Sequence, residues 1–516
     1  MKMMSRRRFL GSAAALGGAA AVGTALWPRR RKRNVILIIS DSMRADVPRC
    51  YGRDWVETPN IDAFAQSAVR CTNAYTCSFP TVPARHDILT STYTFTYKVW
   101  SALDPDTLTL QNVLHSADVH TALIADTHSP FRPAFNYQRD FDFFQKIRGQ
   151  EDDDYIIAPI DVHFPCDPGK LRDPDHYVRQ YLKNVSGRQA EEDYFCAKTM
   201  RTAAHWLEKS HARQPFFLYV DTFDPHEPWD PPHAYVKHYD PDYVGQEVIC
   251  PRYDRWKEFL TPAELKHCQA LYRGEATMVD HWFGHLMDKV QRLGLLENTL
   301  ILFMSDHGVC LGEHGFIGKG IIRHPLLQNF PLYPELCRVP FLAYYPGCKP
   351  GTTVTGLVQP VNVAATILDW LGIRIPEAFR GPSAWPLLQG HEEKIHDIVV
   401  AAPTLSFPGN RVPRPTDRAS ITDGRWLLVY ACAGWGDELG KKPHSPDYKE
   451  KRVEPLTGGR LDPLLFDLSA DPGCQKNVYL ANKPVAADLH RGFFEFLKRS
   501  PMRRDHLEYF EKLENA

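Results

Sequence analysis

Four short apolar runs, each followed by an acidic residue, limit the fold of this chain more than any other feature of its sequence. They consist largely of Val, Ile, Leu, Phe and Ala, and they span residues 34–40, 121–125, 216–220 and 299–305. Short runs that are apolar throughout are typical of parallel strands buried on both faces, which helices must then cover. We therefore expect an α/β fold with a large, mainly parallel sheet flanked by helices.

The polar residues at the ends of these runs are candidates for a binding site. Asp41 ends the first run, and Asp306 and His307 follow the last. Open α/β sheets bind their ligands at the carboxyl ends of parallel strands, so we expect these side chains at one edge of the sheet. Asp41 could instead only cap the next helix, because Ser42 and Asp46 follow it.

Two longer stretches have helical spacing. Thr261, Pro262 and Glu264 supply an N-cap, a proline at the first helical position and a glutamate for a capping box. We expect a long amphipathic helix from this point to a stop near Gly294. Residues 191–209 place apolar side chains on one stripe and predict a second helix with one buried face.

Residues 151–175 interrupt this pattern. They contain several prolines, show no clear period and begin with a run of four acidic residues. We interpret the segment as a surface insertion and the acidic run as a solvated face.

Length and composition indicate two domains. A chain of 516 residues with 43% hydrophobic content can bury a large core, and it is longer than one compact domain usually is. From about residue 377 the apolar runs become shorter, so we expect a larger domain over residues 34–376 and a smaller one over 377–516. The formal net charge of -1 gives no overall field that would hold nucleic acid.

The N-terminus, residues 1–33, resembles a twin-arginine export signal. Arg6 and Arg7 lie between Ser5 and Phe9, and a Gly/Ala-rich run extends to Trp27. A membrane anchor normally needs about 20 strongly apolar residues, and this run is shorter and weaker. We expect a periplasmic or other extracytoplasmic protein with the export machinery as a partner. The basic cluster at residues 29–33 leaves an uncleaved membrane tether open.

The 12 cysteines are even in number, as disulfide pairing in an exported protein would need. Their spacings are irregular and include no Cys-x-x-Cys. We interpret them mostly as small buried residues, with no pairing assigned.

Residues 81–91 carry the motif with the clearest chemistry. Thr81 supplies a hydroxyl, Pro83 stiffens the turn, and Arg85 stands four residues after the hydroxyl. A helix N-terminus with this arrangement presents a nucleophile toward an anion. We interpret Thr81 as that nucleophile.

The order of the motifs resembles that of the sulfatase family. The family signature reads Cys or Ser, any residue, Pro, Ser or Ala, Arg and then Leu-Thr-Gly, and Leu89 and Thr90 stand in register with its end. Threonine in the first position is a departure. Further matches follow in order and spacing: residues 41–52, the Asp-Pro-His-x-Pro of residues 224–228, Ser-Asp-His-Gly at 305–308, Gly-Glu-His-Gly at 312–315 and Gly-Lys-Gly at 318–320.

This resemblance implies a sulfatase fold of the alkaline-phosphatase superfamily, with a catalytic domain over residues 34–376 and an α+β subdomain over 377–516 that carries a short antiparallel sheet. Ser42 stands where the family often has a second aspartate, and Asp126 stands where it has a lysine. His128 matches the family's histidine. Taken alone, His128 would be interpreted as a core histidine.

The resemblance and the strand ends together imply a site for one divalent cation. Two carboxylates, an imidazole and an alkoxide suit a hard or borderline ion, with Ca, Mn, Mg and Zn all left open. Coordination would lower the pKa of the threonine hydroxyl. The expected metal ligands are Asp41, Thr81, Asp306 and His307, and the residues expected around a tetrahedral oxyanion are Arg85, His128, His226 and Lys319.

The threonine decides between chemistries. Sulfatases of the family use a formylglycine made from Cys or Ser, and the secondary alcohol of Thr81 cannot give that aldehyde. We therefore expect a metal-dependent hydrolase of sulfuric or phosphoric esters with Thr81 unmodified, and the chemistry favours phosphorus. The alternatives are a phosphodiesterase or phosphonate hydrolase, a membrane-tethered phosphoryl-alcohol transferase, and a degenerate member that binds an anionic glycan without turnover. The expected substrate is a small-molecule or glycan ester.

Overall fold

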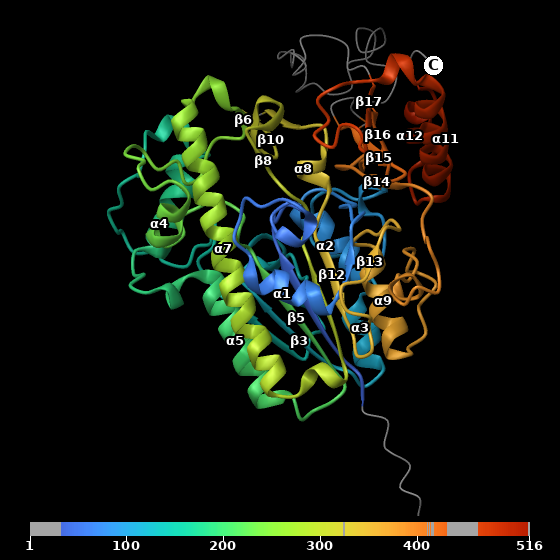
Figure 1. The fold of residues 1–516 in the computed structure, drawn as a ribbon, viewed down its shortest axis with the longest axis horizontal. Coiled ribbons are helices and arrows are strands. Elements are labelled where there is room, and N and C mark those ends of the chain that lie inside the picture. Colours follow the sequence, from blue (N-terminus) through green and yellow to red (C-terminus); the bar gives the residue numbers. More distant parts are fainter. Residues whose placement is uncertain are drawn as a thin grey trace, which may run out of the picture. The chain divides into compact units, whose positions relative to one another are not determined.

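The computed structural model describes residues 32–323, 326–409, 411, 413, 417–430 and 463–513 (Figure 1). Residues 33–516 form one compact unit. The predicted export segment lies outside the described residues except for its last two. Among the described helices, none combines the length and the apolar character that crossing a membrane requires.

An eight-stranded sheet forms the centre of this unit. The four predicted runs lie side by side in it, in the order β7-β1-β5-β3, and each pairs with its neighbour in parallel. β4 extends the parallel part, whereas β12 runs antiparallel to β7 and to β2. The mainly parallel sheet is therefore confirmed. Its full order is β13 (Thr353–Val354), β2 (Val69–Cys71), β12 (Phe341–Tyr344), β7 (Thr299–Met304), β1 (Asn34–Ser40), β5 (Phe216–Thr222), β3 (His120–Ala125) and β4 (Phe143–Lys146).

Both faces of this sheet are buried beneath helices. Ile36 and Ile38 of β1 belong to one apolar core, and Val35 and Leu37 belong to another. The first core includes residues of α1 (Pro59–Ser67), α5 (Phe195–Ser210), α6 (His233–Tyr239) and α7 (Pro262–Arg292). The second includes residues of α2 (Thr81–Thr90), α3 (Leu110–Ser116), α9 (Asn362–Leu371) and α10 (Trp385–Leu388). The continuous apolar runs follow from this double burial.

The long helix α7 begins and ends where the sequence predicts. The Thr261 hydroxyl accepts from the Glu264 N–H at 3.2 Å, and the Glu264 side chain accepts from the Thr261 N–H at 2.9 Å. Gly294, just past the helix, has a φ of 65°, which glycine adopts without steric cost. α5 likewise buries one stripe, which includes Ala204 and Leu207.

A separate antiparallel sheet lies near the C-terminus, as predicted. It has the order β14 (Val399–Ala401), β15 (Ala419–Thr422), β16 (Trp426–Tyr430) and β17 (Leu464–Asp467). α11 (Lys483–Arg499) packs against it through an apolar core that includes Phe493 and Leu497. The division of the chain at residue 377 stays a prediction.

Small elements complete the described fold. One small sheet pairs β10 (Gly320–Arg323) with β11 (Leu326–Asn329), and another has the order β6 (Asp254–Arg255), β9 (Phe316–Gly318) and β8 (Cys310–Leu311). The short helices are α4 (Arg179–Val185), α8 (Pro334–Cys337) and α12 (Arg504–Leu507). Eleven cysteines among the described residues are free, and all but Cys50 and Cys348 are buried.

The acidic run at the start of residues 151–175 is not the solvated face that we predicted from the sequence. Glu151 is 8% exposed and Asp153 is 3% exposed, so neither belongs to a solvated face. Arg148 pairs with Asp153 at 2.6 Å. The hydroxyls of Ser129 and Tyr177 donate hydrogen bonds to Glu151 at 3.1 and 2.9 Å. These partners compensate for burial, which a charge count along the sequence does not register.

Candidate active site

Three carboxylates meet at the carboxyl edge of the central sheet. Asp41 follows β1, Asp221 lies at the end of β5, and Asp306 follows β7 by two residues. β1 lies between β5 and β7, so these three side chains come together from adjacent strands. All three are fully buried.

Thr81 reaches this edge from the first position of α2. Its hydroxyl lies 3.3 Å from Nε2 of His307, and its side chain is almost fully buried. Asp41, Asp306 and His307 each offer a ligand atom, and these atoms lie within 4.8 Å of one another. The structure thus brings together all four residues predicted to hold a metal ion.

The protonation of this group suits a cation. Burial lowers the pKa of His307 to about 3, so the imidazole is neutral. Its Nδ1 lies 2.9 Å from the Gly308 carbonyl, which assigns the proton to Nδ1 and leaves the Nε2 lone pair toward Thr81. Asp41 Oδ2 is buried and makes no hydrogen bond of good geometry within the described residues, although Arg85 Nη1 lies 2.9 Å from it. Two carboxylates, a neutral imidazole and a hydroxyl fit a divalent ion of hard or borderline character.

Ser42 does not replace the missing aspartate as an outward-facing ligand. Its hydroxyl donates to Asp41 Oδ1 at 2.7 Å, and its backbone N–H donates to Asp306 Oδ1 at 3.1 Å. Ser42 therefore orients both carboxylates, as the outer-shell partners of metal ligands do.

Arg85 occupies a different place from the one expected. Its guanidinium is fully buried and pairs with Asp221 at 2.7 Å, with Asp41 at 2.9 Å and with Asp306. We expected it beside a substrate oxyanion, yet it is not among the residues that line the cavity described below. The reason is electrostatic, because three buried carboxylates need a cation among them.

Asp126 and His128 also differ from the family pattern. Asp126 is buried and accepts hydrogen bonds from the hydroxyls of Thr199 at 2.9 Å and Thr222 at 3.2 Å. Its role is therefore structural. Lys146 of β4 brings its Nζ to 3.0 Å from Nδ1 of His128. Burial lowers the pKa of Lys146 to about 8 and that of His128 to about 4. A lysine from the next strand thus lies beside the histidine where the family's own lysine is absent.

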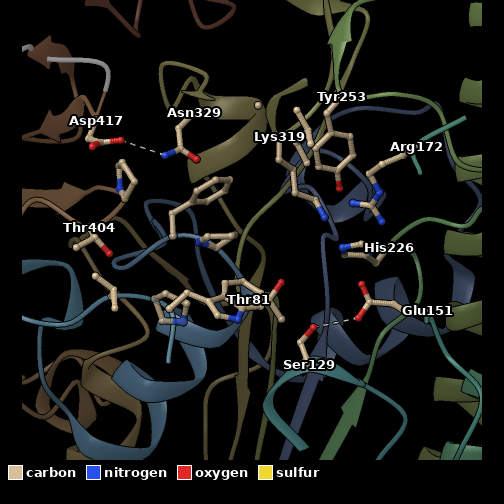
Figure 2. A pocket seen from close by; sticks show the side chains of 18 of the residues that line it. Thr81, Ser129, Glu151, Arg172, His226, Tyr253, Lys319, Asn329, Thr404 and Asp417 are labelled. Carbon is tan, nitrogen blue, oxygen red and sulfur yellow. Dashed lines mark hydrogen bonds between the residues drawn. The ribbon is translucent and has the colours of Figure 1, made fainter. Parts of the chain in front are cut away.

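A cavity of about 490 Å³ opens over Thr81. Figure 2 shows Thr81, His226 and Lys319 pointing toward a common space, as predicted for groups around an oxyanion. His128 does not line the cavity, although its neighbour Ser129 does. The wall also includes the apolar residues Val99, Trp100, Pro403 and Phe407.

His226 is held in a fixed orientation. Its Nδ1 donates to the Glu227 carbonyl at 2.6 Å, and its ring stacks on Phe223 with the ring centres 3.9 Å apart. Burial first, and then the nearby Lys319, lower the pKa of His226 well below its usual value. The histidine is therefore neutral beside a lysine.

Four residues of this site carried no assignment in the sequence. Asp221 ends an apolar run in the same way as Asp41, so the strand-end rule could have found it. Glu227 directly follows His226 in the quoted motif. Glu151 and Arg172 both line the cavity from the segment interpreted as a surface insertion, and that segment gives no periodic signal.

Comparisons with known proteins agree with this geometry. A family model described as Sulfatase matches residues 33–373. The arylsulfatase of Clostridium perfringens is 25% identical over 416 residues, covering 71% of this chain and 81% of that protein. The multifunctional alkaline phosphatase superfamily protein PehA of Trinickia caryophylli is 25% identical over 528 residues, covering 90% and 94%. The crystal structure of the phosphonate monoester hydrolase of Agrobacterium radiobacter has the same fold, with a TM-score of 0.67 at 20% identity, and covers 90% of this chain and 95% of that one.

Proposed function

This chain belongs to the sulfatase family of ester hydrolases, and we propose that it is a metal-dependent member that uses Thr81 as an unmodified nucleophile. The observation that carries the proposal is the position of the Thr81 hydroxyl. It lies at the start of α2, 3.3 Å from His307, and faces the same cavity as His226 and Lys319. A threonine that served packing alone would not need to begin a helix, contact His307 and face the cavity at the same time.

Asp41, Asp306, His307 and Thr81 would hold the metal ion. When bound, a divalent cation lowers the pKa of a coordinated hydroxyl and so supplies a nucleophile near neutral pH. Residues of the chain orient the ligands and stabilise the nucleophile. Ser42 orients the carboxylates of Asp41 and Asp306, and the N-terminus of α2 favours negative charge at Thr81.

Lys319 and His226 lie across the cavity from Thr81 and would face the substrate from there (Figure 2). The Lys319 ammonium stabilises charge on the non-bridging oxygens and can give a proton to the departing alcohol. His226 keeps its Nδ1 proton on the Glu227 carbonyl, so its Nε2 accepts rather than donates. It can therefore take a proton from the water that later opens the covalent ester.

The threonine favours phosphorus over sulfur. The β-carbon of Thr81 carries a methyl group, so oxidation would give a ketone, and the aldehyde hydrate that releases sulfate in the family cannot form. A phosphothreonine can be opened by a second in-line attack at phosphorus. The likeness to a phosphonate monoester hydrolase and to a multifunctional superfamily member supports this preference.

A panel of p-nitrophenyl esters tests the proposal: sulfate, phosphate monoester, phosphate diester and phenylphosphonate. We expect a phosphorus ester to have the highest kcat/KM. Thr81→Ala should abolish turnover and Thr81→Ser should retain part of it. The intact mass of the wild-type protein should show no oxidation, and quenching during turnover should trap a phosphorylated peptide containing Thr81. Full activity of Thr81→Ala would overturn the assignment of the nucleophile.

A further inference from the structure

The wall of the cavity opposite Thr81 contains a cation that none of the sequence motifs includes. Arg172 lines the cavity together with Thr81, His226 and Lys319. In Figure 2 its guanidinium lies beside the ring of His226 and below that of Tyr253. It comes from residues 151–175, the segment that interrupts the periodic pattern of the chain.

Glu227 fixes this part of the wall. Its side chain is fully buried. Oε1 forms an ion pair with Arg172 Nη1 at 3.0 Å and accepts a hydrogen bond from the Tyr253 hydroxyl. Oε2 lies 3.7 Å from Lys319 Nζ and 3.5 Å from His226 Nδ1. One carboxylate thus holds Arg172 and Lys319 on its two oxygens, and it neutralises one of these two positive charges.

The guanidinium of Arg172 has little freedom. Its Cζ lies 4.3 Å from the ring centre of Tyr177 and 4.6 Å from that of Tyr253, at cation–π distance from both. Nη1 is held by Glu227. Nη2 is buried, and the Cys250 thiol also interacts with the guanidinium. The guanidinium is thus held in place on the cavity wall, so an anionic ligand would meet a partner that is already oriented.

We propose that Arg172 is a substrate-binding residue whose guanidinium, together with Nζ of Lys319, binds the non-bridging oxygens of the ester group. The Arg172 guanidinium and the Lys319 ammonium carry one positive charge beyond what Glu227 neutralises, as long as Glu151, which lines the same cavity, keeps its proton. They therefore bind a doubly charged phosphate monoester more tightly than a singly charged sulfate ester of the same shape. This inference rests on the proposed function, because it takes the cavity over Thr81 as the substrate site.

Binding of two small esters tests the preference without turnover. The background is Thr81→Ala with Glu151→Gln, which removes the Glu151 charge from the cavity. At pH 8 methyl phosphate is a dianion and methyl sulfate a monoanion, and calorimetry gives Kd for each. Adding Arg172→Met should raise the Kd for methyl phosphate at least 10-fold and that for methyl sulfate no more than about 3-fold. In the wild-type background, Arg172→Met should lower kcat/KM for the phosphate monoester more than for the sulfate. Equal effects on both esters, or no effect on either, would overturn the proposal.

Arg188 provides a matched control. It also pairs with a carboxylate, Asp230 at 2.9 Å. Its Cζ lies near three aromatic rings, those of Tyr194 at 4.2 Å, Phe195 at 4.7 Å and Tyr181 at 5.7 Å, but it does not line the cavity. Arg188→Met should leave the ratio of the two Kd values unchanged. If Arg172→Met does not fold, Arg172→Gln removes the charge but keeps a polar side chain of similar reach, and it should still shift the ratio.

The outcome separates this inference from the proposed function. If Thr81→Ala kept full activity while Arg172→Met still weakened methyl phosphate binding selectively, the nucleophile would be wrong and the role of Arg172 would stand. If Thr81→Ala were inactive and the Kd ratio did not respond to Arg172, the reverse would hold.

Discussion

Arg85 holds Asp221 by a two-point contact. Nη2 of the guanidinium donates to Asp221 Oδ1 at 2.7 Å, Nε donates to Oδ2 at 3.2 Å, and neither side chain is exposed. The remaining nitrogen, Nη1, faces Asp41 and Asp306. The guanidinium is thereby fixed between a carboxylate that holds it and two carboxylates that are candidate metal ligands.

Asp221→Asn should therefore weaken both the fold and the metal site. The amide of Asn would set an NH2 group against the donors of Arg85, Thr127 and Tyr219 that Asp221 now accepts from, and we expect a loss of about 3 kcal/mol in the free energy of unfolding. The guanidinium would then draw closer to Asp41 and Asp306 and compete with a cation for them. Urea unfolding measures the first effect and a Mn²⁺ titration the second.

Asp126→Asn is the matched control for this substitution, since Asp126 directly follows the neighbouring strand β3 and is equally buried. Burial and the nearby Asp224 raise the pKa of Asp126 well above its usual range. Its carboxyl accepts from hydroxyl and N–H donors rather than from a cation in the described part of the chain, so Asn breaks no ion pair and should cost less than Asp221→Asn. A larger loss for Asp126→Asn would contradict this account of Arg85.

One divalent ion per chain is the second expectation. Asp306→Ala removes a predicted ligand and should leave the dialysed protein without the metal, as elemental analysis would show. Asp280→Asn serves as the control, because Asp280 is also buried but accepts the backbone N–H groups of Asn60 and Ile61 at the start of α1, away from the candidate ligands. Full metal occupancy in Asp306→Ala would remove this site from consideration.

The sequence predicts those parts of the site that local rules govern. The strands before Asp41 and Asp306 are apolar throughout because both of their faces are buried, and Thr81 begins a helix because a proline follows in its first turn. The mainly parallel sheet follows from the same runs. These features need only the residues within a few positions of each element.

The remaining contacts depend on residues distant in the chain. Arg85 meets Asp221 across 136 positions, and Lys146 meets His128 from a different strand. The segment that carries Arg172 has no period, so nothing local indicates that its guanidinium would lie at the cavity. The strand-end rule could have included Asp221, but it could not have shown that Arg85 is buried away from the cavity.

Export is the third expectation, and it concerns residues outside the described part of the chain. We propose that Arg6 and Arg7 direct the protein through the twin-arginine route, which reads paired guanidinium groups. Replacing both by Lys should retain the charge but leave the protein in the cytoplasm, as cell fractionation would show. Replacing Arg29 and Arg30 by Lys, in the second basic cluster, should not affect export. Normal export of the first double variant would indicate another route.

The last expectation concerns the dependence of stability on pH. Burial raises the pKa of Glu151 from 4.5 to about 7, and Arg172 offsets part of this increase. Between these two values the folded protein keeps a proton that the unfolded chain releases. The stabilising effect of that proton is therefore fully present below pH 4.5 and is lost as the pH rises toward 7.

Glu151→Gln should abolish this loss, because the amide stays neutral at every pH. Relative to wild type, the variant should gain stability as the pH rises from 5 to 8, by about 3 kcal/mol at most for a shift of this size. Asp154→Asn removes an exposed carboxylate from the same segment and should leave the pH dependence of unfolding unchanged. Urea midpoints at pH 5 and pH 8 distinguish these outcomes. If wild type and Glu151→Gln gave parallel values, Glu151 would be ionised in the folded protein throughout this range, and the cavity over Thr81 would contain a fixed negative charge opposite the nucleophile.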